Sequence, residues 1–204
     1  HYNMNDAQLR QSFQEFCDSP PTSPLSYLIG PTSIFNGASP YTELLSAGSW
    51  MKEALVQDVP GVSTSYLYIS CSNQPTATNI HFEDCEWLSA NIMIAGAPKL
   101  WLCIEPSSNP RFEACMEQRY TGLLGSCSQR IRHLNAIVPP RLLDDWGVKY
   151  HITACNPGTL IFTLPKTYHE VLNMGPNFAE AINFMTVDSA AIPNGYTFCS
   201  PNLC

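Results

Sequence analysis

Residues 66 to 186 form a series of short apolar segments separated by turn residues, and this pattern constrains the fold more than any other feature of the chain. Short segments rich in β-branched and aromatic residues and bounded by Gly, Pro, Asn or Ser are typical of β-strands. The expected strands cover residues 66–70, 78–83, 90–95, 99–104, 151–155, 160–164, 170–173 and 180–186. They predict a mainly β protein with flanking helices, built as a two-sheet jelly-roll barrel whose mouth can hold a metal and a small cosubstrate.

Helices are expected mainly before the strands. Residues 6–16 carry apolar side chains at helical spacing, with Asp6 as the expected N-cap. Residues 49–56 predict a second helix with Trp50 and Leu55 turned inward, and shorter helices are expected at 111–120 and 140–146. We therefore divide the chain into a helical lead-in (1–60), the barrel (61–186) and a C-terminal segment (187–204), which together make one structural domain.

The motif His81-Phe82-Glu83, followed much later by His169, has the composition of a metal-binding set. Residues i and i+2 of a strand point to the same side, so His81 and Glu83 can ligate one ion while Phe82 packs on the other face. Two imidazoles and one carboxylate are the ligands of non-haem Fe(II) oxygenases, which leave one face of the metal open. The alternative is a strand-end histidine with an exposed glutamate, and His169 as an ordinary half-buried histidine.

Asn91 and Lys99 lie on either side of a Gly-Ala-Pro turn in the strands that follow Glu83. Lys99 stands in an otherwise apolar strand, with Trp101 on the same face, and a lysine buried there needs an anion. The distal carboxylate of 2-oxoglutarate would supply one, while Asn91 would hydrogen-bond the keto acid end that chelates iron. Alternatively, Lys99 lies on an edge strand and extends its ammonium group into water.

The order and spacing of these residues resemble the JmjC domain of the Fe(II)- and 2-oxoglutarate-dependent histone lysine demethylases, whose fold is a cupin-like double-stranded β-helix. Within that family the sequence is most similar to the trimethyl-lysine demethylases that carry a JmjN segment before the JmjC domain. The resemblance is strong over residues 61–184 and faint before residue 50. It rests on these motifs: Gly61-Val62-Ser63-Thr64-Ser65-Tyr66-Leu67-Tyr68, His81-Phe82-Glu83-Asp84, Ser89-Ala90-Asn91, Gly96-Ala97-Pro98-Lys99-Leu100-Trp101, Arg132-His133, Tyr168-His169, Asn173-Met174-Gly175-Pro176-Asn177 and Ala179-Glu180-Ala181-Ile182-Asn183-Phe184.

Carried over by position, the resemblance implies three sets of site residues. The iron ligands would be His81, Glu83 and His169. The residues around 2-oxoglutarate would be Tyr27, Thr78, Asn91 and Lys99, with Tyr27 sharing the distal carboxylate with Lys99. The residues around the peptide and its methyl-lysine would be Tyr68, Asp84, Ala181 and Asn183, since an aromatic face and a ring of oxygens suit a methylated ammonium.

The sequence departs from the family pattern at three places. Thr78 stands where close relatives have an aromatic residue that packs on the cosubstrate, which predicts weaker 2-oxoglutarate binding. Ala181 replaces a small hydroxyl residue of the methyl-lysine pocket, which predicts an altered preference for methylation state. Residues 170–172 replace a small residue, Gly and an aromatic, so the backbone after His169 is expected to run differently.

Cys127 and His133 have the spacing at which the same family supplies two ligands of a structural zinc ion. The expected remaining ligands are Cys199 and Cys204, whose spacing is wider than the family's cysteine pair, with Cys115 as a substitute for Cys204. Two buried free cysteines and a surface histidine would explain the same residues without a metal.

Composition restricts the compartment and the partners. The formal net charge of −7 suits a basic partner, such as a methylated histone tail or nucleosome, and disfavours direct binding to DNA phosphates. Nine cysteines without framework spacing predict reduced thiols inside the cell, and no segment resembles a signal peptide or membrane span. Because the chain begins with His1 rather than Met, we expect an excised domain whose JmjN segment and reader modules lie outside it.

The function that the resemblance implies is removal of methyl groups from a histone lysine, with H3 as the expected histone, by N-methyl hydroxylation that releases formaldehyde and succinate. Iron, 2-oxoglutarate and a structural zinc ion are the expected cofactors. The expected location is the nucleus, with other chromatin proteins as further partners. Two alternatives remain: a JmjC hydroxylase of a protein side chain, and a weakly active or non-catalytic chromatin-binding module.

Overall fold

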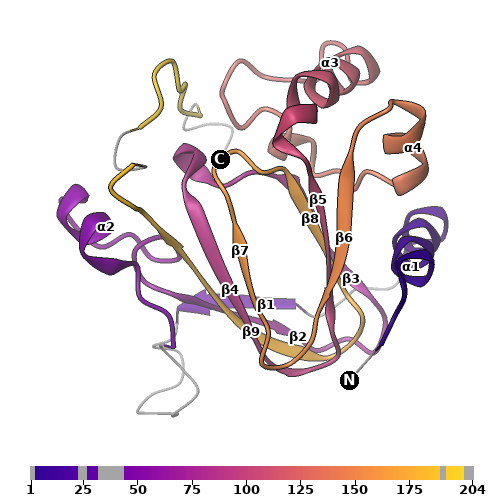
Figure 1. Cartoon of the computed structure of the whole chain (residues 1–204), viewed down its shortest axis with the longest axis horizontal. Helices are drawn as coiled ribbons and strands as arrows, with labels where there is room; N and C mark the ends of the chain where they lie inside the picture. Colours follow the sequence, from indigo (N-terminus) through magenta and orange to yellow (C-terminus); the bar gives the residue numbers. More distant parts are fainter. Residues whose placement is uncertain (1–2, 23–26, 32–43, 189–191, 200–204) are drawn as a thin grey trace.

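The computed structural model of the chain, which describes residues 3–22, 27–31, 44–188 and 192–199, contains two antiparallel sheets that face each other (Figure 1). The five-stranded sheet has the order β1-β2-β9-β4-β7, and the four-stranded sheet has the order β3-β8-β5-β6. The strands are β1 (Tyr27–Pro31), β2 (Tyr66–Ser70), β3 (Thr76–His81), β4 (Leu88–Gly96), β5 (Lys99–Ile104), β6 (Tyr150–Cys155), β7 (Leu160–Thr163), β8 (His169–Asn173) and β9 (Asn177–Phe184). The predicted mainly β, jelly-roll architecture is confirmed.

Each predicted strand is present, with bounds shifted by at most a few residues. The exception to the sequence prediction is β1, which the lead-in 1–60 contributes to the large sheet by pairing with β2. Strand β1 ends in Gly30-Pro31. Proline has no backbone N–H group, so it is tolerated in an edge strand, where no neighbouring strand needs that hydrogen bond. The lead-in is therefore not purely helical.

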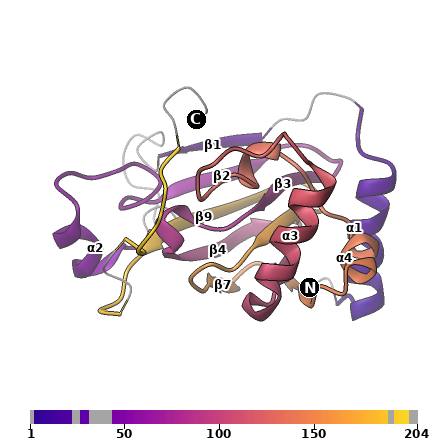
Figure 2. The same cartoon turned by 90° about the horizontal axis from the view of Figure 1, so that it is seen from above.

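The helices lie outside the two sheets (Figure 2). They are α1 (Asp6–Asp18), α2 (Gly48–Ala54), α3 (Asn109–Arg119) and α4 (Pro140–Asp145), with short 3-10 turns η2 (Asp84–Glu86), η3 (Pro106–Ser108) and η4 (Arg132–Leu134). None of the helices in the described ranges is both long and apolar enough to cross a membrane.

Two details of the helix predictions are wrong. Asn5, not Asp6, caps α1, because its side chain accepts from the Gln8 backbone N–H while Gln8 returns a hydrogen bond to the Asn5 backbone. In α2 the completely buried residue is Met51, and Trp50 is 48% exposed, whereas Leu55, just after the helix, packs half-buried against the Met51 cluster as expected. The short helix begins one residue earlier than expected, and its buried face is set by contact with the sheet rather than by residue size.

The main apolar core lies on the outer side of the small sheet rather than inside the barrel. There α1, α3 and α4 cover alternate residues of β5, Leu100, Leu102 and Ile104. A second cluster around Met51 covers part of the outer side of the large sheet, at Ala90 of β4 and Ile182 of β9. The strand residues between these apolar positions therefore point into the barrel, and this alternation gives the interior its polar side chains.

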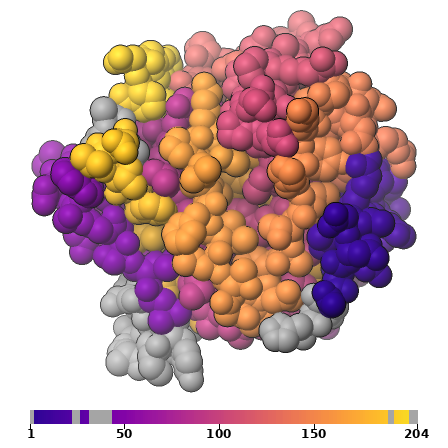
Figure 3. Space-filling model, in the orientation of Figure 1, coloured from indigo at the N-terminus to yellow at the C-terminus, as the bar shows by residue number. Residues whose placement is uncertain are grey.

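The turns that join β4 to β5, β6 to β7 and β8 to β9 gather at one end of the barrel, from which the two sheets diverge (Figure 1). On the face shown in Figure 3, atoms of β6, β7 and their connecting turn cover the centre of the molecule. The barrel thus has a closed end, where β5 begins at Lys99, and a more open end, where β8 begins at His169.

Gly96 closes the β4–β5 turn in a conformation that other residues rarely adopt, with φ of +96°. A Cβ atom there would overlap the Pro176 carbonyl oxygen and lie 2.7 Å from the Asn177 Cα. We expect Gly96→Ala to lower the free energy of unfolding by about 3 kcal/mol or more, measured by urea unfolding. Gly125→Ala, where the added methyl meets nothing within 4 Å, is the control and is expected to change it by less than about 0.5 kcal/mol.

Candidate active site

The structure brings His81, Glu83 and His169 together at the open end of the barrel. His81 ends β3 and His169 begins β8, and the two residues are register partners across the small sheet. One ligand atom from each of the three side chains lies within 4.8 Å of the others, and His169 Nε2 is 3.6 Å from Glu83 Oε1. Such a spacing is what three ligands around one ion require.

The prediction that His81 and Glu83 share one strand is wrong. Strand β3 stops at His81, and Glu83 lies just before η2 with φ of −68° and ψ of 153°. This backbone is still extended, so the alternation of sides continues: Phe82 is buried in the outer core while Glu83 faces His169. His81 and Glu83 therefore point to the same side, as expected, although Glu83 lies outside the strand.

Each histidine ring is oriented by the backbone carbonyl group of the residue two positions before it. His81 Nδ1 donates to the Asn79 carbonyl at 2.7 Å, and His169 Nδ1 donates to the Thr167 carbonyl at 3.0 Å. Because a carbonyl can only accept, each Nδ1 carries the hydrogen and each Nε2 keeps its lone pair for a metal. Trp101 stacks on the His169 ring, which is only 2% exposed, so His169 is not the half-buried histidine of the alternative interpretation.

Charges in the site are those that a metal ion needs. Burial, with the charge of His169, lowers the pKa of His81 and favours its neutral form. Burial alone would raise the pKa of Glu83, but the two histidines and hydrogen bonds from Asn183 and Ser89 hold that pKa below its usual value. Metal ligands must be neutral imidazoles and an ionised carboxylate, and the directions of these two pKa shifts fit that requirement for His81 and Glu83.

Lys99 lies at the closed end with its ammonium group in the barrel interior. It is 2% exposed, and β5 has neighbours on both sides, so the edge-strand alternative does not apply. Burial lowers its pKa to about 8, and Nζ lies 5.6 Å from the centre of the Tyr68 ring. Within the described ranges no acidic side chain forms an ion pair with it.

Other interior polar groups also lack partners among the described residues. The Asn91 Oδ1 and Trp101 Nε1 atoms are fully buried without a hydrogen bond. Lys99 faces Asn173 in the ladder and His169 faces Cys103, so Lys99 and His169 are about 13 Å apart along the sheet. Unsatisfied polar groups along this path, with a cation at one end, fit a small polar anion that reaches toward the triad.

Tyr27 and Thr78, both expected at the cosubstrate, lie next to each other. The Tyr27 hydroxyl is hydrogen-bonded to the side chains of Thr78 and Asn173, and burial raises its pKa to about 12. The Tyr27 ring is 6.4 Å from the Tyr68 ring, which itself lies beside Lys99. Thr78 thus gives Tyr27 a polar partner at the position where relatives have an aromatic residue.

The residues expected to contact the substrate lie in different environments around the triad. Asn183 donates from Nδ2 to Glu83 Oε2 at 3.0 Å and to the Leu88 carbonyl at 3.2 Å, so its amide hydrogens are used within the protein. Ala181 is the register partner of Asn91. Asp84 lies at the rim, half exposed, in an ion pair with Arg132 at 3.1 Å.

Sequence reasoning missed a polar network beside Lys99. Asn173 Nδ2 donates to Thr76 Oγ1 at 2.9 Å, and Asn177 Nδ2 donates to Asn173 Oδ1 at 3.0 Å. Asparagines within apolar strands were the available signal.

Glu170 is a buried acidic residue that does not belong to the site. It faces away from His169 and accepts a hydrogen bond from the Val138 backbone N–H at 2.8 Å, and burial raises its pKa to about 8.

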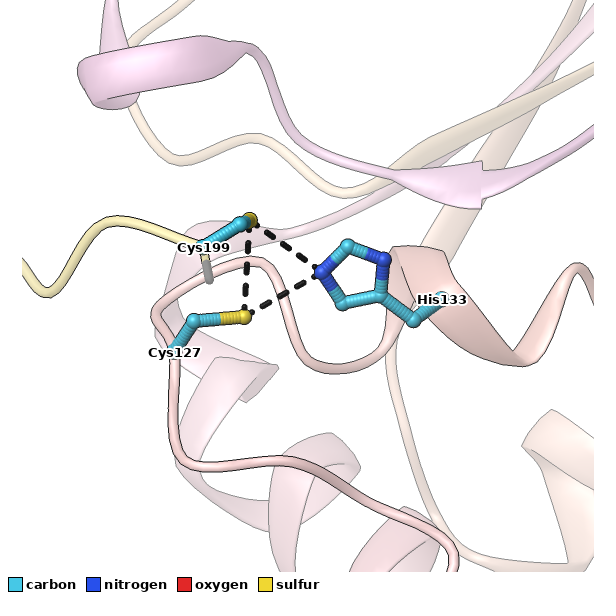
Figure 4. A group of neighbouring side chains, drawn as sticks. All are labelled: Cys127, His133 and Cys199. Atoms are coloured by element: carbon cyan, nitrogen blue, oxygen red, sulfur yellow. Dashed lines mark hydrogen bonds between the residues drawn. The ribbon is translucent and has the colours of Figure 1, made fainter. Parts of the chain in front are cut away.

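A second group of candidate ligands lies near the C-terminal segment (Figure 4). His133 Nε2 is 3.2 Å from both Cys127 Sγ and Cys199 Sγ, and the two sulfurs are 3.6 Å apart. Tetrahedral zinc with bonds of about 2.3 Å would hold two sulfurs about 3.8 Å apart. Cys115 is not a member of this group, and Cys204 lies outside the described residues.

Two facing antiparallel sheets with a His/Glu/His group at the open end define a cupin-like double-stranded β-helix protein of the kind that holds a metal between its sheets. The family model described as "JmjC domain, hydroxylase" matches residues 68–184, and the chain belongs to this family.

Two curated relatives are similar over the same region. Rat "Lysine-specific demethylase 4D" is 30% identical over 158 residues, which cover 76% of this chain and 30% of that protein. Mouse "Lysine-specific demethylase 4B" is 31% identical over 129 residues, which cover 63% of this chain and 12% of that protein. The chain thus spans less than a third of the length of these relatives.

Proposed function

We propose that the protein is an Fe(II)- and 2-oxoglutarate-dependent dioxygenase that removes methyl groups from a histone lysine. The observation that carries the proposal is the His81/Glu83/His169 group together with Lys99 on the same interior surface, a buried lysine without an ion-pair partner among the residues that the structure describes. Two histidines and a carboxylate suit Fe(II), and the buried ammonium suits the distal carboxylate of the keto acid. The names of the demethylase relatives support the substrate class.

Each residue would have a separate task. His81, Glu83 and His169 would hold the metal, and Lys99, with Tyr27 beside it, would bind the distal carboxylate. Asn91, whose Oδ1 has no described partner, would accept or orient a hydrogen bond near the keto acid end. When bound, iron and 2-oxoglutarate would supply the oxidation that converts an N-methyl group to a hydroxymethyl group, which is lost as formaldehyde.

The rest of the site would place the substrate and exclude water. Tyr68 offers an aromatic face at the inner wall, and burial together with Glu83 raises its pKa, so it stays a neutral phenol. Asp84 at the rim would meet a basic peptide such as the H3 tail. Because such a substrate is part of chromatin, we expect the protein in the nucleus, bound to nucleosomes through the histone rather than through DNA.

A protein hydroxylase is the second candidate, and one feature of the pocket, Ala181, favours it. Ala181 has no hydroxyl group where the family pattern has one, whereas Asn183 donates only its amide hydrogens, to Glu83 and Leu88, and keeps Oδ1 as an acceptor. The ring of oxygens that a methylammonium prefers is therefore poorer here than in the family pattern.

The deciding experiment measures formaldehyde and succinate from a panel of methylated histone peptides supplied with Fe(II), 2-oxoglutarate and ascorbate. We expect both products in equal amounts from at least one peptide and neither from the His81→Ala variant. Succinate with a peptide mass increase of one oxygen and no formaldehyde would instead identify the hydroxylase. If neither product appears although metal is bound, the proposal of a catalytic domain is wrong.

We also propose that Cys127, His133 and Cys199 bind a structural zinc ion, with Cys204 as the fourth ligand. Cys127→Ser is expected to reduce zinc from about one ion per chain to near zero and to lower the melting temperature by several degrees, because the ion ties together distant segments. Elemental analysis and thermal unfolding test this. Cys71→Ser, at an exposed cysteine, is the control. A full zinc content in Cys127→Ser would contradict the assignment.

A further inference from the structure

The backbone immediately after Glu83 adopts a conformation that is unfavourable for its residues. Cys85 and Glu86 have φ of +53° and +56°, although neither is a glycine. Consecutive left-handed residues with side chains persist only where the surroundings hold them in place. Since this turn begins one residue beyond a candidate metal ligand, whatever holds the turn also determines where the Glu83 carboxylate lies.

Two side chains from distant parts of the chain hold this turn. Gln129, which is 3% exposed, donates from Nε2 to the Glu83 carbonyl at 3.1 Å and lies 3.4 Å from the Tyr196 hydroxyl. The Tyr196 hydroxyl in turn lies close enough to the Cys85 backbone for that backbone to lower the pKa of the phenol against the larger effect of burial. Gln129 and Tyr196 therefore contact the backbone on both sides of Asp84, where the extended conformation of Glu83 changes to the left-handed turn.

The same loop that carries Gln129 also fixes the other end of the ligand segment. The Asn79 side chain donates to the Arg132 carbonyl at 2.9 Å, and the Ile80 backbone N–H donates to the Ala136 carbonyl at 2.8 Å. Asn79 is the residue whose carbonyl orients the His81 ring. Residues 129–136 thus contact the chain just before His81 and at Glu83.

Gln129 and Tyr196 lie in the two segments that meet at the cysteine and histidine group. Gln129 follows Cys127 by two residues, and Tyr196 precedes Cys199 by three. Between them, the Ser128 N–H donates to the Thr197 carbonyl and the Thr197 N–H donates to Ser128 Oγ, both at 2.9 Å. The two segments that meet at this group are therefore the two that hold the turn after Glu83 (Figure 4).

We propose that Gln129 and Tyr196 are positioning residues for Glu83: they hold the strained turn 83–86 so that the carboxylate stays beside His81 and His169. This inference rests on the proposed metal site and adds a role for two residues that do not touch the metal. Supporting hydrogen bonds of this kind affect metal affinity by about 10- to 100-fold when they are removed. Without Gln129, the Glu83 carbonyl loses its donor and the turn can relax.

The test measures Mn(II) affinity of the full chain, purified with Zn(II), from the loss of the free Mn(II) signal in electron paramagnetic resonance. Mn(II) prefers oxygen and nitrogen ligands over thiolates, so it reports on the His/Glu/His group rather than on the cysteines. The variants are Gln129→Met, which keeps the length but removes the donor, and Tyr196→Phe, which removes one hydroxyl group. Ser108→Ala is the matched control, because it removes a partly buried hydrogen bond from the Lys149 backbone at a place outside the turn 83–86.

We expect Gln129→Met to weaken Mn(II) binding by about tenfold or more and Tyr196→Phe by a smaller factor, with zinc content unchanged. Ser108→Ala should lower the melting temperature without changing the Mn(II) affinity. Wild-type Mn(II) affinity in both variants, with only a lower melting temperature, would show a merely structural role and overturn the proposal. If Gln129→Met does not fold, Tyr196→Phe decides. If the wild-type protein binds Mn(II) no better than His81→Ala, then the assignment of the metal site is wrong, and the proposed function and the positioning role are both contradicted.

Discussion

Replacing His169 with alanine is expected to abolish metal-dependent turnover, with a loss of at least about a thousandfold, and to weaken Mn(II) binding by more than about a hundredfold. His169 is 2% exposed, and its Nε2 is directed at Glu83. Its removal leaves two ligands, and it also removes the ring on which Trp101 stacks. Affinity is measured by Mn(II) titration, and activity by formaldehyde release from a methylated peptide.

The matched control is His151→Ala. His151 is a histidine of the same sheet, but its side chain is 77% exposed and it pairs with Glu105 at the surface. An exposed contact of this kind contributes little, so metal binding and turnover should stay within about twofold of wild type. Should His169→Ala retain wild-type Mn(II) affinity, the assignment of all three ligands would have to be abandoned.

The sequence could predict most strands because they bury one face against the rest of the molecule and point the other into the barrel. Strand β5 shows this most clearly, since its predicted bounds agree with the structure and its alternate residues separate the outer core from Lys99 and Trp101. Strand β1 could not be predicted in the same way. Leu28 and Ile29 are more than half exposed, so its strand conformation depends on pairing with β2 rather than on a pattern of burial.

The same difference, between local patterns and contacts distant in the sequence, decides which site residues could be predicted. The spacing of His81 and Glu83 and the apolar surroundings of Lys99 are local, and the structure brings them to one interior surface. Gln129 and Asn173 act through hydrogen bonds to residues 46 and 97 positions away, which no local pattern encodes. A polar residue in an apolar strand indicates that a partner exists, and only the fold indicates which one.

Replacing Lys99 with methionine is expected to weaken 2-oxoglutarate binding by at least about a hundredfold, because the distal carboxylate would be left in the barrel without its cation. The measurement is the 2-oxoglutarate concentration for half-maximal succinate production, together with stabilisation against urea by added 2-oxoglutarate. Ligand that binds only the folded state should stabilise wild type and leave Lys99→Met unchanged. Equal stabilisation of both proteins would show that Lys99 does not bind the cosubstrate.

In the absence of ligand the same substitution should make the protein more stable at neutral pH. The folded pKa of Lys99, about 8, lies below its unfolded value of 10.5, so the buried ammonium favours the unfolded state. The difference of about 2.5 pH units corresponds to about 3 kcal/mol, which is the full penalty at pH 7 and below. Methionine has a similar length and no charge, so Lys99→Met should raise the free energy of unfolding at pH 7 by about that amount.

The pH dependence has a definite sign. Between about pH 8 and 10.5 the unfolded chain binds more protons at Lys99 than the folded chain does, so wild-type stability should rise with pH as this penalty is lost. Buried thiols oppose this trend above pH 9, because burial raises the pKa of Cys155 to about 11. The informative quantity is therefore the difference in urea unfolding between wild type and Lys99→Met, which should shrink from pH 7 to pH 9.5. A difference that stays constant with pH would mean that Lys99 is not buried as an unpaired ammonium, and that the anion proposed for it has no cation to meet.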